Sequence, residues 1–345
     1  MFRKTNFLSC FIIIGILIFF IVVSECIVRF LSDRHIVSYY KPIELVKQHE
    51  TAEELRLSNV FSNGESEFEY DPLFFWRPKK NVGVFNTLGI RADSSGLQES
   101  VNTSCTVVMY GDSNTVGAFQ GGYYDSPWPE ELGKLLQKHI PDVRIFNMGV
   151  SGYSSYQGLE KFRQDIPFFH PSLVFVAFGW NDAAPNMGIS DKEFHTMLSS
   201  LVSPLNNFRL FQVIKYYSDA LLQRYIQKTV SDGPRVSSED FKNNLVAFIQ
   251  LAQQNNSTIV FITRPHTDFS DSEYSNWRVR VVENNAIIRS VAYEYGVPII
   301  DMEEMFLNQY KNELIDDCHF TQRGHTIAAH EIYTLLQREQ LSCGY

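Results

Sequence analysis

The apolar and polar residues follow different patterns in different parts of the chain. Residues 7–24 are an apolar run without a charge, whereas from residue 106 onward short apolar or β-branched runs alternate with longer amphipathic stretches. Strands that are apolar on both faces and separated by helices are typical of a parallel sheet with helices on each side. The second part is therefore predicted to be a three-layer α/β/α sandwich.

This part of the chain holds the predicted elements of one parallel sheet. The expected strands are residues 106–110, 143–148, 173–178, 258–263 and 297–301. The expected helices lie near Glu130 to His139, Tyr156 to Ile166, Asp240 to Gln254, Asn276 to Tyr295 and Thr321 to Gln340. Each strand is followed by helix-like sequence, as the crossovers of a parallel sheet require.

The interval of about residues 183–238 is longer than a simple crossover needs. Helical periodicity in 191–202 and 211–227 predicts an inserted helical subdomain. The insertion follows the carboxyl end of the third strand, where open α/β sheets bind ligands. It is expected to be either a substrate lid or a plain packing element.

The charge-free run near the amino terminus, about 18 residues, is long enough to cross the hydrocarbon core of a bilayer. Arg3 and Lys4 precede it, so the positive-inside tendency places the amino terminus in the cytoplasm and the rest outside. A cleaved secretory signal is the alternative, and it exports the same domain. We expect a signal-anchored, single-pass membrane protein at a bacterial inner membrane facing the periplasm, or at the cell surface.

Residues 32–102 join this anchor, residues 1–31, to the main domain at 103–345. Ile43 to Leu57 is compatible with a helix. Tyr70 to Gly96 is aromatic and rich in turn residues, so short strands or loops packed onto the main domain are expected there.

Composition narrows the class of partner and the redox chemistry. The chain of 345 residues has a formal net charge of -9, which disfavours a nucleic-acid partner because phosphate binding needs a clustered basic surface. Of the cysteines, only Cys105, Cys318 and Cys343 lie in the exported part, so at most one disulfide forms among them. Their spacing is not that of a zinc site, and no metal or organic cofactor is expected.

Residues able to do chemistry stand after the first strand and before the last helix. Ser113 lies in the turn that follows strand 106–110, at the carboxyl edge of the sheet. A serine hydroxyl needs a base near neutral pH, and His319 is the candidate, with Asp316 three residues ahead to orient its ring. Alternatively, Asp316, Asp317 and Thr321 only cap the last helix. Asp317, His325 and His330 are the nearby competitors for these roles, and we assign His325 and His330 to surface or core packing on that helix.

Two further strand ends offer donors for a developing oxyanion. After the second strand, Gly152 presents a backbone N–H without a Cβ in the way, with Gly149 as the weaker alternative. After the third strand, Asn181 offers a side-chain amide. Each reads alone as a turn or a helix cap, but together with Ser113 they supply what acyl transfer requires.

The blocks GDSN, NMGVSG, GWND and DDCH occur in the order typical of the SGNH/GDSL hydrolase superfamily, which the sequence resembles over roughly 103–339. The resemblance implies the SGNH hydrolase fold, a flavodoxin-like sheet of five parallel strands with the serine after the first. It implies Ser113 as nucleophile, His319 as base and Asp316 as its partner. The implied oxyanion hole consists of the Ser113 and Gly152 amides with Asn181.

Other residues near the ligand edge have weaker assignments. The family's usual leucine after the serine is Asn114 here, which looks like members that act on carbohydrate esters. For Arg91 and His266 a structural ion pair is the simpler role. The candidates for contacting substrate are Asp112, Asn114, Trp180 and Arg264.

The predicted activity is that of a serine esterase that hydrolyses O-acetyl or other short acyl esters, with an acylated carbohydrate as the expected substrate. One alternative keeps the same acyl-enzyme and passes the acyl group to a surface polysaccharide, as an O-acyltransferase. The other is a catalytically idle, membrane-tethered glycan-binding protein. The oligomeric state does not follow from the sequence.

Overall fold

The structure is a computed structural model, and it describes the chain in separate stretches. These are residues 2–34, 36, 67–71, 73–91, 105–119, 122–186, 190–201, 208–214, 217, 233–267 and 275–341. The helix predicted between Ile43 and Leu57 lies outside the described residues. The chain divides into an anchor unit, Met1–Gln48 with Thr196–Ser231, and an α/β unit, His49–His195 with Asp232–Tyr345.

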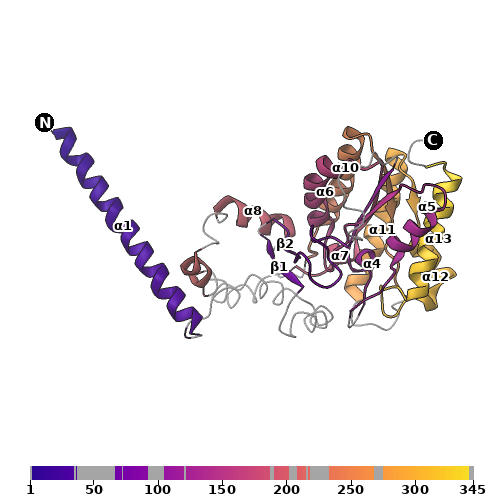
Figure 1. The fold of residues 1–345 in the computed structure, drawn as a ribbon, viewed down its shortest axis with the longest axis horizontal. Coiled ribbons are helices and arrows are strands. Elements are labelled where there is room, and N and C mark those ends of the chain that lie inside the picture. Colours follow the sequence, from indigo (N-terminus) through magenta and orange to yellow (C-terminus); the bar gives the residue numbers. More distant parts are fainter. Residues whose placement is uncertain are drawn as a thin grey trace. The chain divides into compact units, whose positions relative to one another are not determined.

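A sheet of five parallel strands forms the centre of the α/β unit (Figure 1). Its strands are β3 (Thr106–Gly111), β6 (Arg144–Asn147), β7 (Leu173–Ala177), β8 (Thr258–Ile262) and β9 (Ile299–Ile300). Their order is β6-β3-β7-β8-β9, and all neighbouring pairs are parallel. The predicted flavodoxin-like sheet is confirmed.

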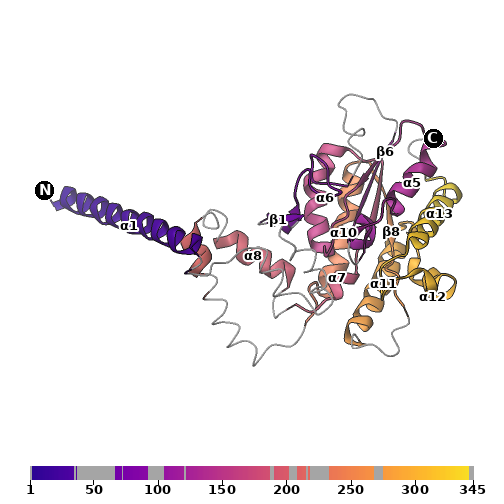
Figure 2. The same cartoon turned by 60° about the horizontal axis from the view of Figure 1, so that its bottom comes forward.

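Helices cover both faces of this sheet, as Figures 1 and 2 show. The helices are α4 (Ser113–Val116), α5 (Trp128–Gln137), α6 (Ser155–Phe169), α7 (Trp180–Ala183), α10 (Ser238–Gln254), α11 (Ser275–Tyr295), α12 (Met302–Asn308) and α13 (Gln322–Arg338), with a 3-10 turn η3 (Lys311–Glu313). One face carries α5, α12 and α13, and the other carries α6 and α10, with α11 packed against α10. The three-layer prediction is confirmed.

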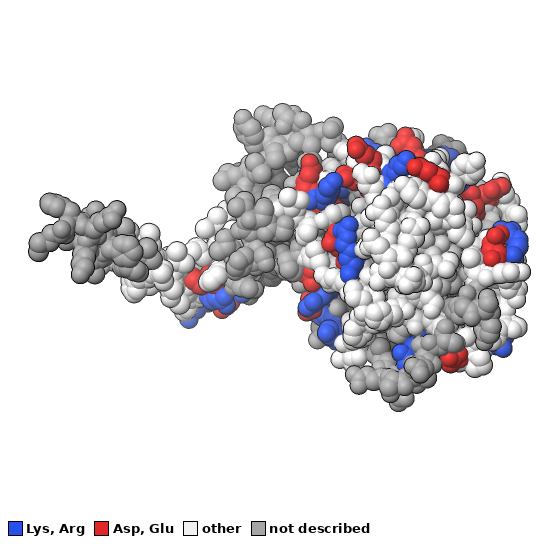
Figure 3. Space-filling view, turned by 90° about the horizontal axis from the view of Figure 1, so that it is seen from above, with Lys and Arg blue, Asp and Glu red and all other residues white. Residues whose placement is uncertain are grey.

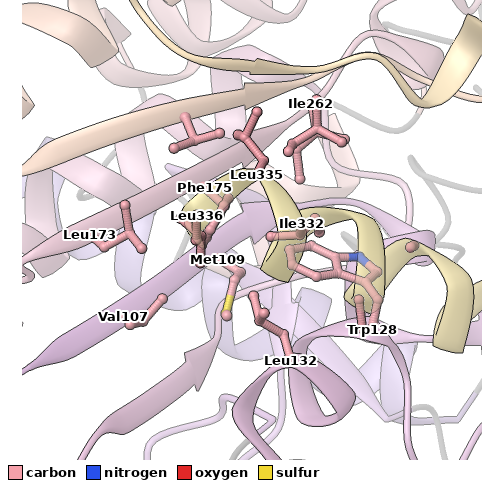
Figure 4. Packing of buried hydrophobic residues seen from close by; sticks show 14 of the residues in the cluster. Val107, Met109, Trp128, Leu132, Leu173, Phe175, Ile262, Ile332, Leu335 and Leu336 are labelled. Atoms are coloured by element: carbon pink, nitrogen blue, oxygen red, sulfur yellow. The ribbon is translucent and has the colours of Figure 1, made fainter. Parts of the chain in front are cut away.

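The core on one side of the sheet joins α5 and α13 to the central strands (Figure 4). Trp128 and Leu132 of α5 and Ile332 of α13 pack toward Met109 of β3 and Phe175 of β7, and all five are buried. Removing a side chain of this size from water contributes about 1.5–3 kcal/mol. The amphipathic spacing of both helices therefore fixes them on this face.

The opposite face has an aromatic core. Tyr110 of β3 meets Phe162 of α6 with ring centroids 5.1 Å apart, and Phe162 meets Phe248 of α10 at 5.3 Å. Burial raises the pKa of Tyr110, whose hydroxyl donates to Asp165 Oδ2 (3.1 Å). Successive residues of β3 thus enter different cores, which anchors the strand that leads to Ser113.

The aromatic lead-in segment packs onto the α/β unit. Strands β1 (Phe68–Asp71) and β2 (Phe75–Pro78) form an antiparallel hairpin. Gln157 Nε2 of α6 donates to Phe74 O at 2.6 Å, and Tyr153 OH donates to Trp76 O at 2.6 Å. The segment is therefore fixed to the loop that follows β6.

The anchor unit holds the long helix α1 (Phe2–Asp33), whose segment Gly15–Asp33 is long and apolar enough to cross a membrane. The insertion contributes α8 (Asp191–Leu201), which begins in the α/β unit, and a helix over residues 209–214.

The surface charges are mixed. On the face seen in Figure 3, basic and acidic side chains are interspersed rather than gathered by sign.

Candidate active site

Ser113 lies where β3 ends at the carboxyl edge of the sheet. Asp112 caps α4, because its side chain accepts the N–H of Asn114 (3.1 Å). Gly111 permits the tight turn, since a Cβ there would lie 2.1 Å from the Thr115 Oγ1. The turn places Ser113 at the first position of α4 with 6% of its surface exposed.

His319 reaches Ser113 from the loop between η3 and α13. Its Nε2 lies 2.8 Å from Ser113 Oγ, and its Nδ1 lies 2.7 Å from Asp316 Oδ2. The second oxygen, Asp316 Oδ1, accepts the N–H groups of Cys318 (2.9 Å) and His319 (2.8 Å). The carboxylate therefore closes a tight turn and faces the imidazole at once.

The helix cap and the second acidic residue have other partners. Thr321 caps α13, since its Oγ1 accepts the N–H of Gly324 at 2.9 Å. Asp317 Oδ1 accepts the hydroxyl of Thr267 (3.1 Å), and Asp317 O accepts the Thr267 N–H (3.0 Å). Asp316 is thus left to the imidazole, and the capping alternative for it is wrong.

His319 and Asp316 each shift the pKa of the other so that its charged form is favoured. Burial lowers the pKa of His319, but the hydrogen bond and charge of Asp316, with the charge of Asp112, outweigh burial and raise it. Burial raises the pKa of Asp316, yet the hydrogen bond and charge of His319 bring it below its usual value. An imidazolium formed when the serine loses its proton is stabilised by this arrangement.

Asn114 ties the serine turn to the histidine loop. Its Nδ2 donates to Cys318 O at 2.6 Å, and its Oδ1 accepts the N–H of Phe320 at 3.0 Å. These two peptide groups flank His319, and the Asn114 side chain is fully buried. The residue next to Ser113 therefore holds the backbone on both sides of His319.

The predicted oxyanion donors gather around the same point. Gly152 has φ +79°, a left-handed conformation that suits glycine. Among the residues that the structure describes, no backbone acceptor takes the N–H of Ser113 or Gly152, whereas the Gly149 N–H donates to Asn147 Oδ1 at 3.0 Å. The geometry therefore favours Gly152 over Gly149.

Asn181 stands between the serine turn and the Gly152 loop. Its Nδ2 donates to Tyr153 O (3.2 Å) and lies 3.4 Å from Asp112 Oδ2. The adjacent Asp182 holds the loop after β7, since it accepts the N–H groups of Gly179 (3.0 Å) and Ser155 (2.8 Å). The amide of Asn181 is thus fixed at the site through two neighbouring loops.

Two residues that sequence reasoning missed orient the Gly152 loop. Trp76 Nε1 donates to Ser151 O at 3.1 Å, which pins the planar peptide whose N–H belongs to Gly152. Arg235 Nη1 donates to Gly152 O at 2.8 Å. A Cβ on Gly152 would lie 3.0 Å from the Trp76 ring, so the indole needs glycine here. The aromatic lead-in was the available signal for Trp76, whereas Arg235 stands in no motif.

Asp112 and Arg264 form a buried ion pair beside Ser113. Arg264 Nη2 lies 2.9 Å from Asp112 Oδ1, and both side chains are at most 2% exposed. Burial raises the pKa of Asp112, while the Arg264 charge opposes that rise. Trp180 is also buried and packs on Trp277, with ring centroids 5.9 Å apart. The four suggested substrate contacts are therefore buried, and their contact with substrate stays a prediction.

The remaining sequence candidates take structural positions. Arg91 pairs with Glu130 (Nε–Oε1 2.9 Å) and donates to Val116 O (2.9 Å). His266 Nε2 lies 2.7 Å from Glu303 Oε1. His325 is buried, and desolvation lowers its pKa to about 3.

Among the described residues, one group of side chains has metal-ligating atoms close together. Asp316, Cys318 and His319 each offer one such atom, all within 4.8 Å of one another. Two of them are the hydrogen-bonded pair at Ser113, and Cys318 is a buried thiol outside any disulfide, with its Sγ 3.6 Å from His319 Nδ1. The group is therefore part of the Ser113 site.

Comparison with known proteins matches most of this chain to a family. A family model described as the GDSL-like Lipase/Acylhydrolase family matches residues 109–327, more than half of the chain. An uncharacterized lipoprotein, YqeF, of Bacillus subtilis (strain 168) is 22% identical over 233 residues, covering 61% of this chain and 76% of that protein. An arylesterase of Vibrio mimicus is 29% identical over 111 residues, covering 31% of this chain and 52% of that protein.

Solved structures give the same kind of match at low identity. A lipase/acylhydrolase from Enterococcus faecalis is 18% identical, with a TM-score of 0.45 over 68% of this chain and 96% of that one. A catalytic mutant of Axe2, an acetylxylan esterase from Geobacillus stearothermophilus, is 15% identical, with a TM-score of 0.45 over 71% and 96%. The family model decides the assignment: this chain is a member of the GDSL-like lipase/acylhydrolase family and hence a carboxylic ester hydrolase.

Proposed function

We propose that the chain is a serine esterase that forms an acyl-enzyme on Ser113. The observation that carries this proposal is the unbroken line of hydrogen bonds from Asp316 Oδ2 to His319 Nδ1 (2.7 Å) and from His319 Nε2 to Ser113 Oγ (2.8 Å). It joins a hydroxyl, a base and an orienting carboxylate, which are the parts that serine acyl transfer needs.

In the first half-reaction His319 Nε2 takes the proton of Ser113 Oγ as the oxygen attacks the ester carbonyl. The tetrahedral intermediate collapses when His319 returns that proton to the leaving alcohol, and the acyl group stays on Ser113. In the second half-reaction His319 deprotonates water as it attacks the acyl carbon, and His319 then returns this proton to Ser113 Oγ as the bond to the acyl group breaks and the carboxylic acid leaves. Asp316 keeps the Nδ1 proton in place throughout.

The oxyanion is received by the Ser113 and Gly152 amides and by Asn181. Support comes from the two uncommitted backbone N–H groups and from the pinned peptide of Gly152. A donor of this kind typically contributes about 2.7–4 kcal/mol to transition-state stabilisation. For Asn181 to act as an oxyanion donor, its Nδ2 has to give up a hydrogen bond, such as the one to Tyr153 O, and donate to the oxyanion instead.

The acyl group that we propose is acetyl or another short chain on a carbohydrate. Ser113 has only 6% of its surface exposed, which favours a small acyl group. The proposal that the leaving group is a carbohydrate depends only on Asn114, which resembles the residue after the serine in family members that act on carbohydrate esters.

The proposed location is outside the cytoplasm, with α1 as the membrane anchor. Support comes from the length and apolarity of Gly15–Asp33 and from Cys105, which is disulfide-bonded, whereas Cys26 and Cys318 are not part of a disulfide. Structural disulfides persist in oxidising compartments. A fusion of alkaline phosphatase after Tyr345 tests this: activity in intact cells is expected, and an inactive fusion of normal abundance argues against export.

Hydrolysis of p-nitrophenyl acetate and longer p-nitrophenyl esters by the full chain tests the activity. The Ser113→Ala variant is expected to lose turnover with its melting temperature retained. Ser257→Ala is the matched control, because it also removes one buried hydroxyl. Ser257 lies just before β8, at the amino edge of the sheet, whereas Ser113 lies at the carboxyl edge. Ester cleavage retained by pure Ser113→Ala protein contradicts the proposal. Addition of an oligosaccharide acceptor separates hydrolysis from acyl transfer.

A further inference from the structure

The insertion after β7 contacts the anchor helix directly. Glu25 of α1 accepts the N–H groups of Arg209 (2.8 Å) and Leu210 (2.7 Å), at the start of helix 209–214. The Arg209 guanidinium in turn donates to Ser32 Oγ at 3.0 Å. Figure 1 shows this helix at the carboxyl end of α1. The two elements are joined by hydrogen bonds at a defined level of α1.

That level is the end of the apolar run. Residues 7–24 lack charges, and Glu25 is the first charged residue after them. Ile18 within the run is 56% exposed, whereas Glu25 is 8% exposed. A carboxylate beside lipid is costly unless it is bonded, and Glu25 has Arg29 Nε at 2.6 Å besides the two amides. When the charge-free run 7–24 is the part of α1 that lies in the hydrocarbon, helix 209–214 starts where α1 leaves it.

The docked segment is amphipathic. Leu210, Val213, Ile214 and Tyr217 have the i, i+3, i+4, i+7 spacing of one helix face. Ile214 is 56% and Tyr217 is 49% exposed, and Phe208 just before the helix is 44% exposed. The polar side of the segment turns toward α1, since Arg209 is bonded there. Phe208 and Ile214 thus present apolar surface to the outside of the anchor unit.

We propose that helix 209–214, with Phe208 before it and Tyr217 after it, is a membrane-interfacial element whose apolar face lies in the lipid–water boundary, held there by Glu25. The proposal rests on α1 spanning the bilayer. Amphipathic helices with aromatic and aliphatic residues on one face bury that face at the headgroup boundary, and Tyr and Phe are favoured at this depth. The occupant of the face is therefore lipid, and the insertion joins the catalytic unit to the bilayer surface.

Spin-label accessibility in the full chain tests the proposal. Cys10 and Cys26 are replaced by serine, single cysteines are placed at Ile214 or Tyr217, and the protein is reconstituted in phosphatidylethanolamine/phosphatidylglycerol vesicles. Ile18→Cys is the lipid reference, and Tyr293→Cys, 93% exposed in the α/β unit, is the aqueous reference. The parent without an added cysteine gives the background.

Labels at 214 and 217 are expected to be more accessible to oxygen than to a water-soluble nickel chelate, as at 18 and in contrast to 293. A label at 214 that behaves like the one at 293, while 18 is lipid-like, overturns the interfacial helix but leaves the anchor. If 18 is also aqueous, the anchor itself fails. Dipolar broadening that disappears on dilution with unlabelled protein points to a second copy as the occupant and also overturns the proposal.

The contact with Glu25 has its own variant. Glu25→Ala removes the acceptor of the Arg209 and Leu210 amides but leaves the apolar run intact. The oxygen-over-nickel preference at 214 is expected to fall by several-fold, with the value at 18 unchanged. An unchanged preference at 214 shows that Glu25 does not hold the helix at this depth.

Discussion

Asn114 holds His319 from both sides, through hydrogen bonds to Cys318 O at 2.6 Å and from the Phe320 N–H at 3.0 Å. The serine turn and the histidine loop are therefore joined by the main chain as well as by the Ser113–His319 contact. Asn114 is thus a polar residue at the position after the serine, where the family that the sequence resembles usually has leucine.

Replacing Asn114 by leucine is expected to lower kcat about 10–100-fold with KM nearly unchanged, because each buried peptide group left unpaired costs about 1–3 kcal/mol and the His319 loop loosens. Steady-state kinetics and labelling of Ser113 by a fluorophosphonate measure the effect. Asn114→Asp keeps the acceptor for Phe320 and is expected to be intermediate.

The control for Asn114 is Asn244→Leu, which removes a buried amide that donates to Ser155 Oγ (2.9 Å) on α6. Its expected effect is lower stability with kcat retained. Equal losses of kcat in both variants would mean that Asn114 acts only through general stability.

Asp316→Asn is expected to move the acidic limb of the pH–rate profile to lower pH. The pKa of His319 is raised by Asp316 against the effect of burial, and the base must be neutral to act, so activity falls as pH drops through that raised pKa. Without the carboxylate charge the pKa falls and the limb follows it, while maximal kcat drops by about 10²–10⁴-fold. A limb that stays in place would show that the profile reports another group.

Trp76→Phe is expected to lower kcat about tenfold, because the ring packing stays but the hydrogen bond that pins Ser151 O and directs the Gly152 N–H is lost. The test is kcat with an activated ester, alongside thermal unfolding. Trp128→Phe in the core between α5 and the sheet is the matched control, with stability but not kcat reduced. If both variants keep wild-type kcat, the indole hydrogen bond does not direct the oxyanion donor.

His325 is expected to make the fold acid-sensitive. Burial lowers its folded-state pKa to about 3, against about 6.5 in an unfolded chain. Its neutral form therefore supports stability above about pH 6.5, and that contribution is lost as pH falls toward 3, by up to roughly 4–5 kcal/mol. Denaturant unfolding from pH 7 to 4 measures this loss.

His325→Gln is expected to flatten the pH dependence of unfolding, since it removes the titrating group from contact with Trp128 N, which lies 3.3 Å from His325 Nδ1. His330→Gln is the control, because His330 is exposed on the same helix. An identical slope in wild type and His325→Gln would assign the acid sensitivity elsewhere.

The strands and the principal site residues were predictable because their signals are local. A run such as 106–110 has to be a buried strand, and β3 covers Thr106–Gly111. The three-residue spacing of Asp316 and His319 encodes a tight turn, which the Asp316 carboxylate closes by accepting the His319 N–H. The roles of Ser113, Gly152 and Asn181 stay predictions.

Other contacts could not be predicted because they join distant positions. Asn114 meets Phe320 across 206 residues, and nothing in either segment identifies the other. Trp76, in the lead-in segment, and Arg235, at the end of the insertion, both bind the Gly152 loop. Neither segment carries a motif that points to this loop. For the insertion, periodicity predicted helices but not that helix 209–214 would dock on Glu25.

The position of Ser113 and His319 at opposite ends of the catalytic unit's sequence sets when an ester can first be cut. The serine turn is made early in synthesis, but its base arrives only with the loop before α13, the last helix. A chain made amino end first therefore lacks the Ser113–His319 contact until nearly all of it has been synthesised. A product that ends before residue 319 never forms this contact, so the proposed nucleophile is left without its proposed base.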